Sequence, residues 1–230
     1  DAYKIHSSDL SNPYLLKYAA QTGRRIDLSV GASTLDEIQN AIQVLKDMKN
    51  GNLWLMYGYQ NFPTPFSKIN LRVMLKLKEL FELPVGYQDH SDAEREEAFW
   101  VPAAAIGLGA DVVEKHITHD RSRKGIDHES ALNPDEFSNF VRMVRIINEA
   151  QGSSVPVPFS AEEARYRTVS KKSIVSSRQL RSGTVIGEED VLFMRAAATG
   201  LPPDRADRLV GRTLKHDIGP YELIMEKDIV

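Results

Sequence analysis

Two short apolar runs in the middle of the chain each end in a histidine. Residues 83–90 read Leu-Pro-Val-Gly-Tyr-Gln-Asp-His, and residues 110–116 read Ala-Asp-Val-Val-Glu-Lys-His. Each run has the length and composition of a buried β-strand, and the segment between them has the character of a helix. In a series of parallel βα units, polar groups at the carboxyl ends of successive strands converge above the sheet. His90 and His116 therefore predict a site at the carboxyl edge of an α/β sheet.

The same two histidines indicate a metal. Imidazole is the side chain that most often binds metals in proteins. The alternative is two unrelated structural histidines, which is the more frequent interpretation of any single histidine. Two histidines at equivalent strand ends, with Glu114 and Asp127 nearby in the sequence, favour a metal-assisted active site.

Composition narrows the class of protein. The chain has 230 residues, 42% of them hydrophobic and 27% charged, which suits a globular protein with a substantial core. A net charge of −3 argues against a nucleic-acid partner, and no apolar run has the length of a membrane span. Cysteine is absent, so thiolate chemistry and disulfides are excluded. We expect a cytoplasmic enzyme.

The first 150 residues alternate strand and helix signals. The predicted strands are Ala2–Ile5, Ile26–Val30, Leu53–Tyr57, Val85–Tyr87 and Val112–Glu114. The predicted helices are Pro13–Thr22, Thr34–Lys49, Ser67–Phe81, Ala93–Gly107 and Pro134–Ala150. Repeated βα units imply a parallel sheet with right-handed crossovers.

The predicted fold class is α/β. The five strands look like most of a (β/α)₈ (TIM) barrel that lacks its first three βα units, over residues 1–151. An open doubly wound sheet is the alternative. Residues 152–167 are rich in small residues and proline and predict a linker with a short helix at Ala161–Arg165. Residues 168–230 predict a small β-rich domain with strands at Ser173–Ser176, Val191–Met194 and Leu223–Ile224.

Taken in order, the motifs resemble one known family. The series resembles the sialic acid synthase family, the phosphoenolpyruvate-dependent nonulosonate synthases, and its tail resembles the family's C-terminal antifreeze-like (SAF) domain. The motifs of the first part are Tyr3–Ser7, Leu28–Gly31, Phe62–Pro65, Gly86–His90, Glu114–His116, Gly125–His128 and Ser130–Leu132. The motifs of the tail are Lys172–Val175, Arg181–Gly183, Met194–Arg195 and Leu209–Arg212.

The resemblance implies a reaction of sialic acid and polysaccharide biosynthesis. Phosphoenolpyruvate condenses with the open-chain aldehyde of a 2-acetamido sugar, typically N-acetylmannosamine, to give a nine-carbon 2-keto acid and phosphate. The family uses Mn²⁺ or a similar divalent ion such as Mg²⁺ or Co²⁺, and it acts as a domain-swapped homodimer. The family's first three strands carry a catalytic glutamate and a second phosphate-binding lysine. We therefore expect residues 1–230 to hold an incomplete site that is inactive by itself.

The resemblance also assigns roles to the strand-end residues. His90 and His116 match the metal ligands. Lys4, Ser7 and Ser29 match positions that bind phosphoenolpyruvate. A trianionic substrate needs cationic and hydroxyl donors, which these three residue types supply.

Further positions match the sugar-binding residues. Glu114 lies two residues before His116, so both side chains share one face of the strand, and it completes the predicted catalytic set with the two histidines. Asp127 matches an acidic residue for the distal hydroxyls, and Gln60 stands where the family has Asn or Ser. Arg195 matches an arginine of the SAF domain that reaches the partner subunit's active site and contacts the N-acetyl group.

Three departures surround the predicted site. Besides Gln60, Phe62 replaces a usual tyrosine and Gln88 replaces a usual serine, which leaves the acceptor sugar open. Two other functions also remain open. A Schiff-base aldolase would use Lys4 as its nucleophile, and a non-catalytic SAF-domain protein would bind sugar without turning it over.

Overall fold

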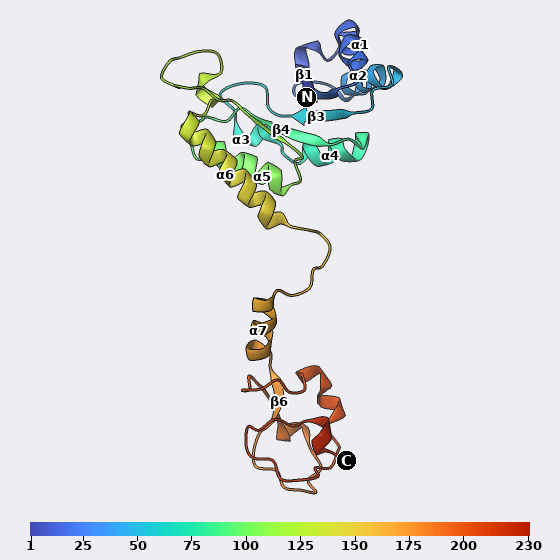
Figure 1. Cartoon of the computed structure of the whole chain (residues 1–230), viewed down its shortest axis with the longest axis vertical. Coiled ribbons are helices and arrows are strands. Elements are labelled where there is room, and N and C mark those ends of the chain that lie inside the picture. The colour runs from blue at the N-terminus through green and yellow to red at the C-terminus, as the bar shows by residue number, and fades with distance from the viewer. The chain divides into compact units, whose positions relative to one another are not determined.

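The computed structural model describes residues 1–230 and divides into two units, Asp1–Gly152 and Ser153–Val230. The first unit is an α/β unit built on one parallel sheet (Figure 1). Neighbouring strands follow one another in sequence order, β1-β2-β3-β4-β5, as the repeated βα pattern predicts. The strands are β1 (Ala2–Ile5), β2 (Arg25–Ser29), β3 (Leu53–Tyr57), β4 (Val85–Asp89) and β5 (Val113–Lys115).

Helices link the strands and cover one face of the sheet. Ile26 and Leu28 of β2 are fully buried beneath them, and Asp27 between these two faces the other side, because side chains alternate along a strand. The helices are α1 (Pro13–Gln21), α2 (Leu35–Asp47), α3 (Phe66–Ile69), α4 (Val73–Phe81), α5 (Glu97–Gly107) and α6 (Pro134–Gln151). Short 3₁₀ turns lie at η1 (Ser7–Asp9) and η2 (His128–Ser130). None of the helices is both long and apolar enough to span a bilayer.

Local sequence sets where the main helices begin. The Thr34 side chain accepts the amide of Glu37, whose carboxylate accepts the amide of Thr34, and this reciprocal pair caps α2. At α6, which has a proline at its first position, the Glu136 carboxylate accepts the amide of Asn133 at 2.7 Å. Satisfied amino-terminal amides explain why these helices begin close to the predicted residues.

Two predicted helices differ from the observed ones. The predicted helix Ser67–Phe81 is split into α3 and α4, because Asn70 adopts a left-handed conformation with φ +50° that ends the first turn of helix. Helix α5 begins at Glu97 rather than Ala93. The Asp92 side chain there accepts the amide of Glu94, and this local turn replaces the first helical turn.

The sheet is curled into a half-barrel. Its concave face carries the polar side chains of Lys4, Ser29, Gln88 and Glu114, whereas its outer face packs against the helices. Lys4 on β1 reaches Glu114 on β5 across this face, with 2.6 Å between Nζ and Oε1. A flat sheet would separate the first and fifth strands by roughly 19 Å, at about 4.8 Å per strand. The contact therefore requires strong curvature.

The second unit is small and built around an antiparallel pair. Strands β6 (Ser173–Ser176) and β7 (Val191–Met194) pair in the predicted places. Leu223 makes only a single bridge to Val175 rather than the predicted strand. Helix α7 (Ala161–Ser170) runs five residues past the predicted Arg165, since no glycine or proline interrupts it. The buried core of this unit comprises Ile174, Leu180, Ile186, Leu209, Leu214, Ile218 and Ile224.

Helix α4 offers a matched test of the packing. Leu77 is 3% exposed and faces the core, whereas Leu75 on the same helix is 43% exposed. We expect Leu77→Ala to lower the free energy of unfolding by about 2–5 kcal/mol, because it leaves a cavity. Leu75→Ala should cost clearly less. Urea denaturation of both variants measures the difference, and equal losses would contradict the orientation of α4.

Candidate functional site

Five polar side chains form one connected array on the concave face of the sheet. Lys4 Nζ donates to Glu114 Oε1 at 2.6 Å, and Gln88 Nε2 donates to the same oxygen at 3.2 Å. Ser29 Oγ donates to Gln88 Oε1 at 2.9 Å. Gln60 Nε2 also approaches Gln88 Oε1, at 3.4 Å. The array thus joins side chains from β1, β2, β4, β5 and the loop after β3.

The strand pattern brings these residues together. Glu114, Gln88 and Ser29 lie at or next to the carboxyl ends of their strands, and Glu114 pairs in register with Gln88. Parallel strands present their carboxyl ends at one edge of a sheet, so groups far apart in the sequence meet there. Ser29 and Gln88 are buried, whereas Lys4 and Glu114 remain partly open to solvent. A charged pair at the rim above buried donors is an arrangement that suits an anionic ligand.

His90 and His116 lie side by side, as the sequence predicts for two strand ends. Their ring centroids are 5.0 Å apart and the rings are tilted by 55°. Nδ1 of His90 and Nε2 of His116 are buried and have no hydrogen-bond partner. Buried polar atoms are nearly always paired in folded proteins, so two unpaired ring nitrogens on neighbouring histidines fit the donors of a metal ion.

The electrostatics of the pair favour neutral imidazole at His90. Burial lowers the pKa of His90, and the neighbouring His116 lowers it further, while Asp89, Asp127 and Glu114 act in the opposite direction. The neutral ring is the form that binds metal ions.

The donor set fits a divalent cation through two nitrogens. No group of three or more His, Cys, Asp or Glu side chains in the chain has an arrangement that could hold a metal. Two histidines leave the remaining coordination positions to water or substrate oxygens. That combination of nitrogen and oxygen donors suits metals with octahedral preferences.

A buried ion pair lies directly behind the histidines. Lys115 Nζ and Asp89 Oδ2 are 2.5 Å apart, and the two side chains are 1% and 0% exposed. The two residues are partners in the register of β4 and β5, and each precedes one histidine. Their side chains therefore point to the opposite face of the sheet and hold the two strand ends together.

Hydrogen bonds satisfy the remaining lone pairs of Asp89. Tyr87 Oη donates to Asp89 Oδ1 at 3.1 Å, and Ser91 Oγ donates to Oδ2 at 2.6 Å. Burial and the Asp89 carboxylate raise the pKa of Tyr87, which keeps its hydroxyl protonated as a donor. The sequence reasoning missed this cluster. Its only signal was a charged residue at the same register in two apolar strands.

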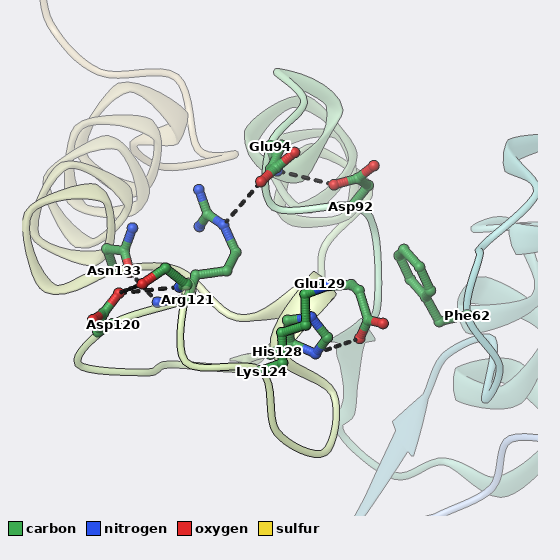
Figure 2. A pocket seen from close by; sticks show the side chains of 10 residues that line it. Phe62, Asp92, Glu94, Asp120, Arg121, Lys124, His128, Glu129 and Asn133 are labelled. Atoms are coloured by element: carbon green, nitrogen blue, oxygen red, sulfur yellow. Dashed lines mark hydrogen bonds and ion pairs between the residues drawn. The ribbon is translucent and has the colours of Figure 1, made fainter.

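A hydrophilic cavity of about 700 Å³ adjoins this edge of the sheet. It lies between Phe62 and the loops that follow β4 and β5, and Figure 2 shows Arg121 directed towards Glu94 and His128 paired with Glu129. Hydrogen bonds from Arg121 lower the pKa of Glu136, so this pair stays ionised beside the cavity. The lining residues are Phe62, Asp92, Glu94, Asp120, Arg121, Ser122, Lys124, His128, Glu129 and Asn133.

Three predicted site residues stand outside both the array and the histidine pair. The Ser7 side chain lies in η1 and makes no hydrogen bond to the array. Asp127 has a left-handed backbone with φ +56°, is exposed, and lies near enough to influence the pKa of His90. Arg195 directly follows β7 in the second unit and is exposed.

Comparison with protein families gives two matches. A model described as the NeuB family matches residues 1–156, and a model described as the SAF domain matches residues 171–230. These ranges contain the half-barrel sheet and the β6–β7 unit, respectively.

Individual relatives agree with these matches. An N,N'-diacetyllegionaminic acid synthase of Campylobacter jejuni is 32% identical, covering 97% of this chain and 66% of that protein. An N-acetylneuraminate-9-phosphate synthase of Homo sapiens is 31% identical, covering 98% of this chain and 61% of that protein. A crystal structure of N-acetylneuraminic acid (sialic acid) synthetase from Leptospira borgpetersenii in complex with citrate superposes with a TM-score of 0.63. The two sequences are 33% identical, and the match covers 72% of this chain and 57% of that one. The chain spans less than two thirds of the length of these proteins.

Removing one partner of the Asp89–Lys115 pair tests its structural weight. We expect Lys115→Met to destabilise the first unit by about 3–5 kcal/mol, because it leaves a buried carboxylate unpaired. The double variant Asp89→Leu/Lys115→Met should recover much of this loss. Denaturant unfolding gives both values.

The exposed pair Lys76–Glu79 on α4 is the matched control. Lys76→Met should cost no more than about 1 kcal/mol, since exposed ion pairs contribute little. A loss from Lys115→Met as small as that of the control would contradict the burial of the pair.

Proposed function

The chain belongs to the NeuB family, and from this premise we propose that the protein condenses phosphoenolpyruvate with the aldehyde of a 2-acetamido sugar such as N-acetylmannosamine. A carbon–carbon bond forms between C3 of phosphoenolpyruvate and the aldehyde carbon, whose oxygen takes up a proton to become a hydroxyl. Water adds at C2, and phosphate leaves with cleavage of its bond to carbon. The product is a nine-carbon 2-keto acid of the sialic, legionaminic or pseudaminic type, the products named for the relatives.

One feature of the site carries this proposal. An array of donors anchored by Lys4 and Ser29 lies at the same sheet edge as the unpaired nitrogens of His90 and His116. Lys4 and Ser29 would bind the anionic groups of phosphoenolpyruvate, and Ser7 lies on the turn that follows β1 and Lys4. Glu114 would accept hydrogen bonds from the sugar hydroxyls.

We assign the metal to His90 and His116, with Mn²⁺ as the first choice and Mg²⁺ or Co²⁺ as substitutes. A bound divalent ion supplies Lewis acidity that polarises a carbonyl oxygen. The buried, unpaired ring nitrogens support the assignment.

The hydrophilic cavity is the proposed place of the acceptor sugar. Its charged lining suits a hydroxylated ligand better than an apolar one. Asp127 precedes two of the lining residues and would bind the distal hydroxyls. Phe62 lines the cavity and Gln60 belongs to the array, and we propose that both affect the choice of sugar.

The complete catalyst requires more than these residues. We propose that the half-barrel sheet belongs to a (β/α)₈ barrel, because its strands β1 and β5 have open edges and its relatives are longer. We also propose a domain-swapped homodimer in which Arg195 of the SAF domain contacts the sugar's N-acetyl group in the partner's site. The exposure of Arg195 at the end of β7 is consistent with such a contact.

A Schiff-base aldolase finds less support. That chemistry needs a free amine on Lys4. The Lys4 Nζ instead donates to the Glu114 carboxylate at 2.6 Å and is part of the polar array.

Phosphate release tests the proposed reaction. Full-length protein with Mn²⁺, phosphoenolpyruvate and a panel of 2-acetamido sugars should release phosphate with one sugar and not without it. His116→Ala should abolish release, whereas His216→Ala, an exposed histidine of the second unit, should not. Absence of release with every sugar would favour the non-catalytic binding protein.

Metal binding is measured separately from activity. Titration calorimetry with Mn²⁺ should show one binding site. His90→Ala should lower the affinity for Mn²⁺ by more than about tenfold, because the loss of a residue that merely supports a metal ligand already lowers affinity by about that factor. His216→Ala is again the control. Unchanged affinity in His90→Ala would contradict the two-histidine site.

A further inference from the structure

We infer that Gln88 is the positioning residue of the proposed active site, holding the Glu114 carboxylate and the Ser29 hydroxyl in place at the same time. The Gln88 side chain is 1% exposed and bonds to residues from two other strands. This role rests on the proposed function, because it concerns how the site binds phosphoenolpyruvate.

The amide of Gln88 has both chemical capacities that the position needs. Its Nε2 donates to Glu114 on one side, and its Oε1 accepts from Ser29 on the other. A carboxylate can only accept and an apolar side chain can do neither. An amide is therefore suited to link an acceptor to a donor.

Reach is the second requirement. Gln88 lies near the carboxyl end of β4 and Ser29 lies at the carboxyl end of β2, with β3 between them. The side chain must therefore cross above β3. Gly58 directly follows β3, and a Cβ there would lie 2.2 Å from the backbone carbonyl oxygen of Gln88 and 2.8 Å from the Cβ of Gln88. Glycine therefore lets the backbone after β3 approach β4 closely at the residue that carries this side chain.

A second glycine makes room for the neighbouring amide. A Cβ at Gly31 would lie 2.5 Å from both Cγ and Nε2 of Gln60. Gln60 in turn approaches Gln88 Oε1. Glycine at position 31 thus leaves room for the Gln60 amide beside Gln88.

Glu114 Oε1 receives two donors, the Lys4 ammonium and the Gln88 amide. An anionic substrate attracts Lys4 and weakens the first of these contacts. The bond from Gln88 keeps the carboxylate oriented while Lys4 turns to the substrate. A negative charge at position 88 would instead repel Glu114 and compete for Lys4.

Steady-state kinetics of full-length variants test this role. Gln88→Glu has nearly the same shape but lacks the donor, and Gln88→Met lacks both polar groups. We expect the KM for phosphoenolpyruvate to rise by about tenfold to a hundredfold in Gln88→Glu. This factor corresponds to the loss of one hydrogen bond to a charged group. Gln88→Met should raise KM less, since it adds no charge. In both variants kcat should fall less than KM rises.

Asn50→Asp is the matched control. Asn50 is a buried amide at the other end of β3, where it donates to the carbonyl of Arg24. This change should lower the thermal midpoint and leave KM unchanged. If the Gln88 variants only unfold at a lower temperature, or only have a lower kcat, while the KM for phosphoenolpyruvate is unchanged, the positioning role is overturned.

The wild-type protein separates the two hypotheses. Wild-type phosphate release with an unchanged KM in both Gln88 variants overturns the role of Gln88 alone. No release by the wild-type protein with any sugar overturns the proposed function and this role with it. Calorimetric titration with phosphoenolpyruvate checks the same ranking of affinities without turnover.

Discussion

The contact between Lys4 and Glu114 depends on the curl of the sheet, and the rest of the site depends on that curl. The two residues are 110 positions apart and lie on the first and fifth strands. Their side chains meet only because the polar face is concave. The same curvature brings Ser29 and Gln88 within hydrogen-bond distance across β3. Hydrophobic packing of the helices on the outer face stabilises the curved sheet and leaves the concave face free for polar groups.

Successive side chains at the ends of β4 and β5 point to opposite faces of the sheet, so each strand end contributes to the site on one face and to packing on the other. His90 and His116 belong to the concave side, and the residues just before them, Asp89 and Lys115, form the buried ion pair on the outer side. A buried pair of this kind contributes little net stability compared with apolar residues. Its effect is geometric, because it fixes the register of the two strands from which the histidines project.

The family match and the individual side chains of the site support different parts of the proposal. The NeuB match supports the type of reaction, and the two histidines with the Lys4 array supply matching groups. Gln60 and Gln88 place two long amides in this array, and glycine at position 31 leaves room for the Gln60 side chain. The fold thus supplies the common site, while the long amides adjust its interior.

The sequence by itself determined the parallel sheet, its strand order and the pairing of His90 with His116, because periodicity and strand ends are local signals. It also indicated Lys4, Ser29 and Glu114, through motifs that resemble a family. Tertiary structure alone decided which of these side chains touch, that Gln88 connects them, and that a buried ion pair supports the histidines. Contacts between distant strands depend on the curvature of the sheet, which no local pattern encodes.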